Sequence, residues 1–168
     1  MGIPKSSPKA DSSLFSSDLI ALAQRHTFGQ KITVTRCCNN YGPWQDKEKV
    51  IPTFILNAIQ GNSMPIYGSG MNIREWIHVE DHCLAIQGVI QKGESGEIYN
   101  IGSGESLTNL KIAKLLVETF GKGPDQIEFV QDRLGHDFRY ALNSKKIFDL
   151  TGINVNKRLI PFLRDSLS

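Results

Sequence analysis

Residues 31–61, KITVTRCCNNYGPWQDKEKVIPTFILNAIQG, contain a strand pattern, a polar turn and a helix pattern in direct succession. The first six residues alternate and are rich in β-branched side chains, which is typical of a strand. The Asn-Asn-Tyr-Gly-Pro sequence that follows ends this pattern and predicts a loop. A helix is predicted over residues 50–62, because Pro52 suits a first turn and Gly61 suits a helix end. The stretch therefore predicts one strand–loop–helix unit.

The same alternation continues on both sides of this unit. A helix is expected over residues 16–29, with Ser16 or Ser17 as its N-cap and Gly29 at its end. Further strands are expected within residues 64–70, 73–79, 96–104 and 126–131, and further helices within residues 80–94, 106–123, 143–152 and 158–168. Strands that alternate with helices define the α/β class. Residues 1–16 are expected to be a flexible lead, and residues 17–168 one α/β domain.

The composition is that of an ordinary globular domain. The 168 residues are 40% apolar and 21% charged, with a formal net charge of +2, so neither nucleic acid nor a membrane surface is an expected partner. No apolar run is long enough to span a membrane, and the first residues lack the apolar segment of a signal peptide. Three cysteines without a Cys-x-x-Cys pair argue against a disulfide framework or a zinc site, and they favour a reducing cytoplasm.

Residues 133–140, RLGHDFRY, place Arg133, His136 and Arg139 within seven positions. A charged surface loop is one interpretation of this spacing. An anion clamp is the other, because a guanidinium presents two N–H groups to one oxyanion and a nearby histidine adds a further donor. Both interpretations stay open on these residues alone.

Three other loops carry residues suited to a ligand, and they follow expected strands, where α/β proteins bind their ligands. Asn39 follows the strand of residues 31–36 and offers an amide, although an ordinary Asx turn would use the same residue. Lys49 precedes the helix that begins at Val50, where unpaired N–H groups favour an anion, although any helix start has them. Tyr67 could stack on a base and Arg74 could bind a phosphate.

The segment HVEDH, residues 78–82, places two histidines four positions apart. On a helix, His78 and His82 would share one face with Asp81, which is a possible metal-ligand arrangement. The preferred interpretation is structural, with His78 ending a strand and the two acids stabilising the start of a helix. No metal site is therefore expected.

Four segments together resemble the C-terminal half of the dTDP-glucose 4,6-dehydratase family, within the extended short-chain dehydrogenase/reductase superfamily. They are TRCCNNYGPWQDKEKVIPTFILNAIQG, PIYGSGMNIREWIHVEDH, GEIYNIGSGESLTN and DRLGHDFRYALNSKKI, in this order along the chain. The resemblance runs from about Ser17 to the end. It implies the C-terminal part of a dehydrogenase/reductase fold, in which residues 17–48 contribute to the edge of an incomplete Rossmann sheet and the rest forms a substrate-binding domain.

The resemblance implies a bound nucleotide-sugar, dTDP-glucose or a related compound. Arg74 and Arg133 would hold its diphosphate, and Asn39 would meet the diphosphate and sugar end. For Arg139 the expected role is to order its loop. The nucleotide cleft would be lined by three consecutive residues, Lys49, Val50 and Ile51.

The resemblance also assigns residues to the base. Pro65 and Tyr67 would flank the thymine, and Asn109 and His136 would complete the nucleotide pocket. The family reaction oxidises C4 of the sugar with NAD, removes water across C5 and C6, and returns the hydride to C6. NAD is therefore the cofactor expected in the complete family enzyme.

Two elements of the family pattern do not occur in these 168 residues. There is no GxxGxxG fingerprint, and no tyrosine is followed four positions later by a lysine. We therefore expect that this chain alone has no catalytic residues and does not bind NAD. The alternative functions are a non-catalytic nucleotide-sugar-binding module or a split subunit that needs an N-terminal partner. The expected assembly is a homo-oligomer or a complex with a partner that supplies the N-terminal half.

Overall fold

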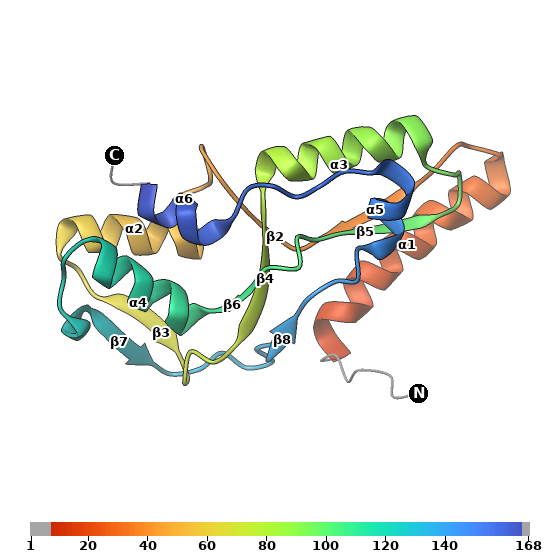
Figure 1. Cartoon of the computed structure of the whole chain (residues 1–168). Helices are drawn as coiled ribbons and strands as arrows, with labels where there is room; N and C mark the ends of the chain where they lie inside the picture. Colours follow the sequence, from red (N-terminus) through yellow and green to blue (C-terminus); the bar gives the residue numbers. More distant parts are fainter. Residues whose placement is uncertain (1–7, 166–168) are drawn as a thin grey trace.

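The described part of the chain forms three small sheets whose strands come from distant parts of the sequence (Figure 1). This computed structural model describes the backbone of residues 8–165 and the side chains of residues 16–165. The first sheet pairs β1 (Val34–Cys37) in parallel with β5 (Ile98–Ile101). The second centres on β4 (Ile73–His78), which pairs with β2 (Asn39–Tyr41), β6 (Ser106–Thr108) and β8 (Arg139–Tyr140). The third pairs β3 (Met64–Tyr67) in parallel with β7 (Ile127–Val130).

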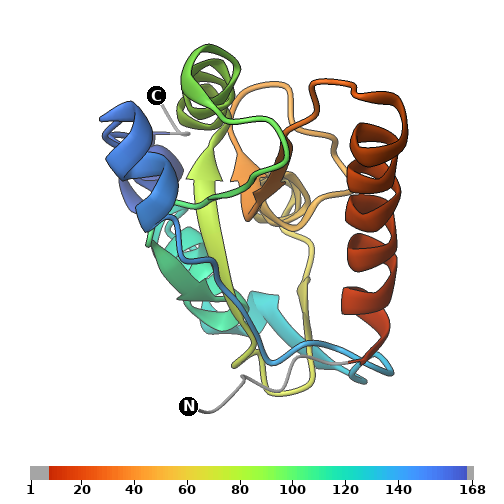
Figure 2. The ribbon, with the colours of Figure 1, turned by 90° about the vertical axis from the view of Figure 1, so that its right-hand side faces the viewer.

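Helices pack against these sheets and confirm the predicted α/β class. They are α1 (Pro8–Phe28), α2 (Val50–Gln60), α3 (Val79–Lys92), α4 (Asn109–Thr119), the 3-10 turn η1 (Pro124–Gln126), α5 (Lys145–Thr151) and α6 (Leu159–Asp165). Figure 2 shows α1 on the opposite side of the ribbon from α5. None of the described helices is both long and apolar enough to cross a bilayer.

Three details of the predicted elements were wrong, and a fourth, the cap of α5, was right only in part. The helix expected from Ser16 begins at Pro8, so the expected flexible lead is helical over its described residues, and residues 1–7 lie outside the description. Asn39–Tyr41, predicted as loop, forms β2, because its backbone pairs in parallel with residues 76–78 of β4. β6 and β8 were not predicted, since each has only two or three residues and depends on pairing with β4. Asn143 caps α5 as expected, through a bond of 3.1 Å from the Lys145 N–H, although Ser144 is its N-cap residue.

Two separate groups of buried side chains form the core. The first lies between α2, α4 and α6 and includes Trp76 and Tyr41. The second lies between β1, β5, α3 and α5 and includes Ile77 and Tyr99. Successive residues of a strand point to opposite faces, so β4 supplies Trp76 to one core and Ile77 to the other. This strand is the wall that the two cores share.

Among the described side chains of α1 (residues 16–28), polar ones contact the rest of the fold, and Leu19, Ile20 and Phe28 are exposed. Asp18 pairs with Arg36 of β1, and the Arg25 Nε donates to Ser95 Oγ at 3.1 Å. Leu19 and Ile20 are each 65% exposed. Within the described residues β1 pairs only with β5. Within the described residues, the first sheet therefore has an unpaired edge at β1, and the neighbouring helix α1 exposes three large apolar side chains.

Candidate functional site

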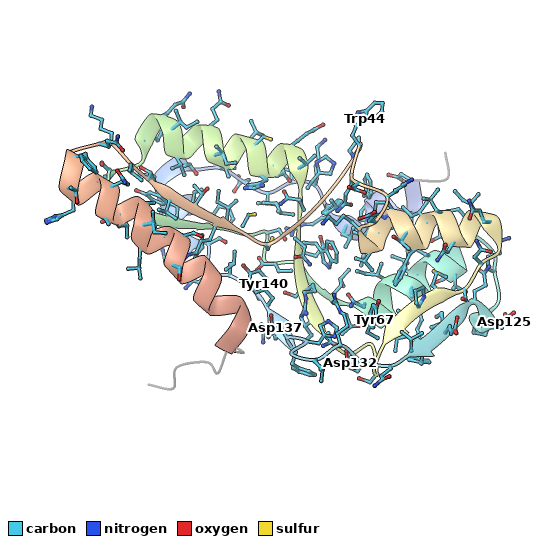
Figure 3. The ribbon with its side chains drawn as sticks, turned by 180° about the vertical axis from the view of Figure 1, so that it is seen from behind. Trp44, Tyr67, Asp125, Asp132, Asp137 and Tyr140 are labelled. Carbon is cyan, nitrogen blue, oxygen red and sulfur yellow. The ribbon has the colours of Figure 1, made fainter. Side chains whose placement is uncertain are left out.

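One polar cavity of about 420 Å³ lies where α2 begins, β3 ends and the loop of residues 131–138 crosses. Figure 3 shows Tyr67, Asp132 and Asp137 close together in this region, with Trp44 and Asp125 far from it. The cavity lining includes nearly all of the residues predicted for a ligand site, namely Asn39, Lys49, Val50, Pro65, Tyr67, Arg74, Asn109, Arg133 and His136. The structure thus brings together residues separated by almost 100 positions in the sequence.

Arg74 is held in a defined orientation on β4. Its two terminal nitrogens donate to the carbonyl oxygens of Ile73 and Asp137, each at 2.8 Å. The Asn72 side chain donates to the same Asp137 carbonyl at 3.0 Å, which fixes the loop beside the strand. A guanidinium has five N–H donors, so these two bonds leave others for a ligand. Burial lowers the pKa of Arg74, and the charge of Arg133 acts in the same direction against the opposing effect of Asp137.

Arg133 and His136 lie together against Tyr67. The Arg133 guanidinium carbon is 4.9 Å from the centre of the Tyr67 ring, which is a cation–π contact. Its Nη2 lies 3.4 Å from His136 Nε2, and the His136 ring meets the Tyr67 ring edge-on at 6.4 Å. The three side chains form one wall of the cavity, with a positive charge and an aromatic face side by side.

The opposite wall is the N-terminus of α2. Lys49 occupies the N-cap position without a side-chain cap bond, and the first turn contains no acidic residue. Val50 and Thr53 line the cavity from this turn. Helix N-termini attract anions through their unpaired N–H groups and the helix dipole. The cavity therefore has cationic groups on two sides, with Glu48 as the acidic residue in its lining.

A second cavity, also about 420 Å³, adjoins the first and shares Asn39, Lys49, Val50 and Trp76 with it. Its other lining residues are Cys38, Asn40 and Gln45. The Asn40 carbonyl accepts from Gln45 Nε2 at 2.9 Å, which links two residues of this lining. Burial raises the pKa of Cys38 to about 12, so its thiol is protonated at neutral pH and is no nucleophile.

Two predicted residues lie away from the first cavity. Ile51 is buried in the core and does not line it, because the helix turns this side chain inward. Arg139 is exposed on β8 and is not part of the lining either. Trp76 lines both cavities but was not predicted, although its position two residues after Arg74 on a strand places both on one face. Asp132, which contacts His136, was also missed.

The residues of HVEDH have structural partners. His78 is the N-cap of α3 and accepts from the Glu80 N–H at 3.2 Å. His82 Nδ1 lies 2.8 Å from Asn40 Oδ1, and Asp81 accepts from the Lys157 N–H at 3.0 Å. Burial lowers the pKa of both histidines. Among the described residues, no three His, Cys, Asp or Glu side chains are grouped so that they could hold a metal ion.

The first cavity is lined by cationic side chains and lies at the end of β3, which pairs in parallel with β7. Ligands of nucleotide-binding α/β folds bind at such strand ends. The model of the NAD dependent epimerase/dehydratase family matches residues 13–102. The chain belongs to this family. The match includes β1, β2, α2, β3, β4, α3 and β5, and it ends just before β6.

Individual members of the epimerase/dehydratase family extend the comparison beyond the matched segment. A dTDP-glucose 4,6-dehydratase from Streptomyces niveus is 52% identical over 130 residues, which cover 77% of this chain and 39% of the relative. The structure of a dTDP-glucose 4,6-dehydratase from Streptomyces venezuelae, with NAD and TYD bound, superposes with a TM-score of 0.88 at 42% identity and covers 93% of this chain and 48% of that one. The enzyme from Bacillus anthracis in complex with NAD gives a TM-score of 0.87 at 40% identity, covering 99% and 52%.

These superpositions confirm the predicted fold class. The described residues have the α/β arrangement of part of a Rossmann-like dehydratase. The chain spans about 40% of the length of the curated relatives it matches, and about half of the solved ones. It is thus a partial member of the family.

Proposed function

We propose that this chain is the substrate-binding part of a dTDP-glucose 4,6-dehydratase and that the first cavity binds dTDP-glucose or a related nucleotide-sugar. The observation that carries the proposal is the placement of Arg74 and Arg133 on the same cavity as the N-terminus of α2. A diphosphate is the ligand that suits these groups best, because each guanidinium can present two N–H groups to an oxyanion and the helix N-terminus attracts anions. Tyr67 provides an aromatic surface for a base next to the arginines, and the adjoining cavity has amide groups suited to sugar hydroxyls.

NAD belongs to this proposal as the cofactor of the complete enzyme, which would use it to oxidise C4 before water is lost across C5 and C6. We do not expect this chain by itself to bind a dinucleotide, because its 168 residues contain no GxxGxxG fingerprint. In the described part, α3 and α4 follow β4 and β6 directly, and the glycines of residues 102–104 lead from β5 into the strand β6 and not into a helix. A cytoplasmic location is proposed with it, since Cys37, Cys38 and Cys83 are all unpaired thiols.

A second candidate is a nucleotide-sugar-binding module that acts as a split subunit. The specific observation in its favour is that these 168 residues contain no tyrosine followed four positions later by a lysine. Both candidates use the same ligand site, so binding tests the site first and turnover distinguishes the two.

Replacing Arg74 or Arg133 with alanine is expected to weaken dTDP binding by about 10-fold or more in each case. A charge-assisted hydrogen bond contributes roughly 1.5–3 kcal/mol, and about 1.4 kcal/mol corresponds to a tenfold change in Kd. Isothermal titration calorimetry measures the change. The matched control is Arg139→Ala, which removes an exposed arginine of β8 that does not line the cavity and should leave Kd within about twofold. Unchanged affinity in both cavity variants would exclude the clamp.

The isolated chain is expected to associate with itself or with a partner that supplies the N-terminal part of the family fold. The unpaired edge of β1 (Val34–Cys37) and the exposed Leu19 and Ile20 of α1 are features that usually acquire a partner. Light scattering coupled to size-exclusion chromatography over a range of concentrations checks this. A stable monomer with cooperative unfolding and slow amide exchange in residues 31–36 would contradict it.

A further inference from the structure

Asp132 has a position that the proposed ligand contacts do not explain. Its Oδ1 accepts hydrogen bonds from His136 Nδ1 at 2.6 Å and from the Arg133 backbone N–H at 2.8 Å. The bond from His136 lowers the pKa of the Asp132 carboxyl, so Asp132 is ionised at neutral pH. An ionised carboxylate can only accept, and this contact therefore requires a proton on His136 Nδ1.

The second carboxylate oxygen of Asp132, Oδ2, lies against the turn that follows Tyr67. Gly68 follows Tyr67 with a φ of +56°, and a Cβ added there would lie 2.8 Å from Asp132 Oδ2. The Gly68 N–H donates to the Val130 carbonyl at 2.9 Å, which holds the turn beside the strand that leads to Asp132. Glycine is thus suited to this position both by its backbone conformation and by the space that the carboxylate occupies.

The proton on His136 Nδ1 determines what its second nitrogen can do. With Nδ1 as donor, Nε2 of the neutral ring is an acceptor, and Arg133 Nη2 lies 3.4 Å from it. The His136 side chain is only 5% exposed, so the ring has little room to turn. Arg133 in turn lies over the Tyr67 ring. A chain of contacts therefore runs from Asp132 through His136 to Arg133 and Tyr67.

We propose that Asp132 is a positioning residue of the nucleotide site, which fixes the tautomer and orientation of His136 and through them the place of Arg133 against Tyr67. Asp132 does not line the cavity, so it acts through its neighbours and not by touching the ligand. The effect on affinity rests on the proposed function. The effect on the His136 tautomer does not, because all of its contacts are within this chain.

The test compares Asp132→Ala with two matched variants. Asp132→Asn keeps an oxygen that can accept from His136 Nδ1, and Asp125→Ala removes another exposed aspartate, which lies after α4 and far from the cavity (Figure 3). Two quantities are measured in each: the Kd of dTDP by calorimetry, and the protonated nitrogen of His136 by ¹⁵N NMR at a pH where its ring is neutral. Circular dichroism confirms that each variant is folded.

The wild type is expected to carry the proton on Nδ1. Asp132→Ala should lose this preference and bind dTDP roughly tenfold more weakly, which is the low end of the cost of removing the carboxylate that orients a histidine in metal sites. Asp132→Asn should keep part of the Nδ1 preference and part of the affinity for dTDP. Asp125→Ala should match the wild type in both quantities. An unchanged tautomer, or an unchanged Kd, in folded Asp132→Ala would overturn the proposal. If the wild type does not bind dTDP, the proposed ligand is wrong and the tautomer comparison alone decides the role of Asp132.

Discussion

Glu75→Ala is expected to lower the free energy of unfolding by roughly 3–5 kcal/mol, a large part of the total stability of a domain of this size. Glu75 is 1% exposed on β4, and its two oxygens accept from the Gly104 N–H at 2.7 Å and the Leu142 N–H at 2.6 Å. Alanine would leave both N–H groups without their partner. The carboxylate also fills the space beside Gly102, where any larger residue would collide with it.

Chemical denaturation of the purified variant measures this loss. Glu75→Gln keeps one acceptor oxygen and should lose less stability than Glu75→Ala. Glu128→Ala is the matched control, because Glu128 is an exposed strand glutamate on β7 whose carboxylate accepts only from Ser63 Oγ among its described bonds, and a surface change of this kind stays within about 0.5 kcal/mol. Equal midpoints for Glu75→Ala and Glu128→Ala would show that the buried carboxylate does not stabilise the fold.

The second large effect concerns turnover. The 168-residue chain alone is expected to form no 4-keto-6-deoxy product from dTDP-glucose and NAD, because the reaction needs a positioned base next to the cofactor. Neither the Tyr-x-x-x-Lys pair nor a glycine-rich fingerprint occurs in its sequence. Addition of the N-terminal segment of a dehydratase relative, which supplies both, is expected to raise product formation from background to a measurable rate.

Product analysis by chromatography distinguishes the outcomes. The Arg74→Ala, Arg133→Ala double variant should fail to produce turnover with the same segment, since it removes both guanidiniums from the cavity. Product formed above background by the purified chain alone would show that its catalytic groups have been misassigned. Binding of dTDP without turnover in the mixture would instead favour the non-catalytic module.

The sequence predicts the longer elements well because their signals are local. The 50–60 helix, for example, ends at Gly61 with a φ of +74°, as its glycine indicates. β2 could not be predicted, because two of the three residues of Asn39–Tyr41 are asparagines, which disfavour strands, and the segment becomes a strand through its pairing with residues 76–78. The true start of α1 was missed for the opposite reason, since Ser- and Pro-rich residues resemble a loop and give no helical period.

Some residues of the candidate site could likewise be predicted from the sequence and others could not. Arg74 and Arg133 could be found because arginines are a chemical signal for an oxyanion, and the family resemblance placed them on one ligand, although Arg74 lies within β4 and only Arg133 lies in a loop. Ile51 shows the limit of a residue-by-residue transfer, because a helix rotates about 100° per residue and turned this neighbour of Val50 into the core. Asp132 lies next to Arg133 in the sequence, yet its bond to His136 depends on a loop shape that no pattern encodes.

The strand β4 has a consequence for engineering this chain. Four consecutive residues of β4 have four different roles. Arg74 lines the ligand cavity, and Glu75 is a buried carboxylate. Trp76 packs in the first core and Ile77 in the second. A residue inserted before them would exchange the two faces of the strand and place Glu75 where Trp76 packs in the first core. The chain therefore cannot be cut, tagged or lengthened here, whereas the exposed turn at Gly121, with its φ of +61° and no atom within 4 Å of an added Cβ, is an open place for a fusion or a reporter.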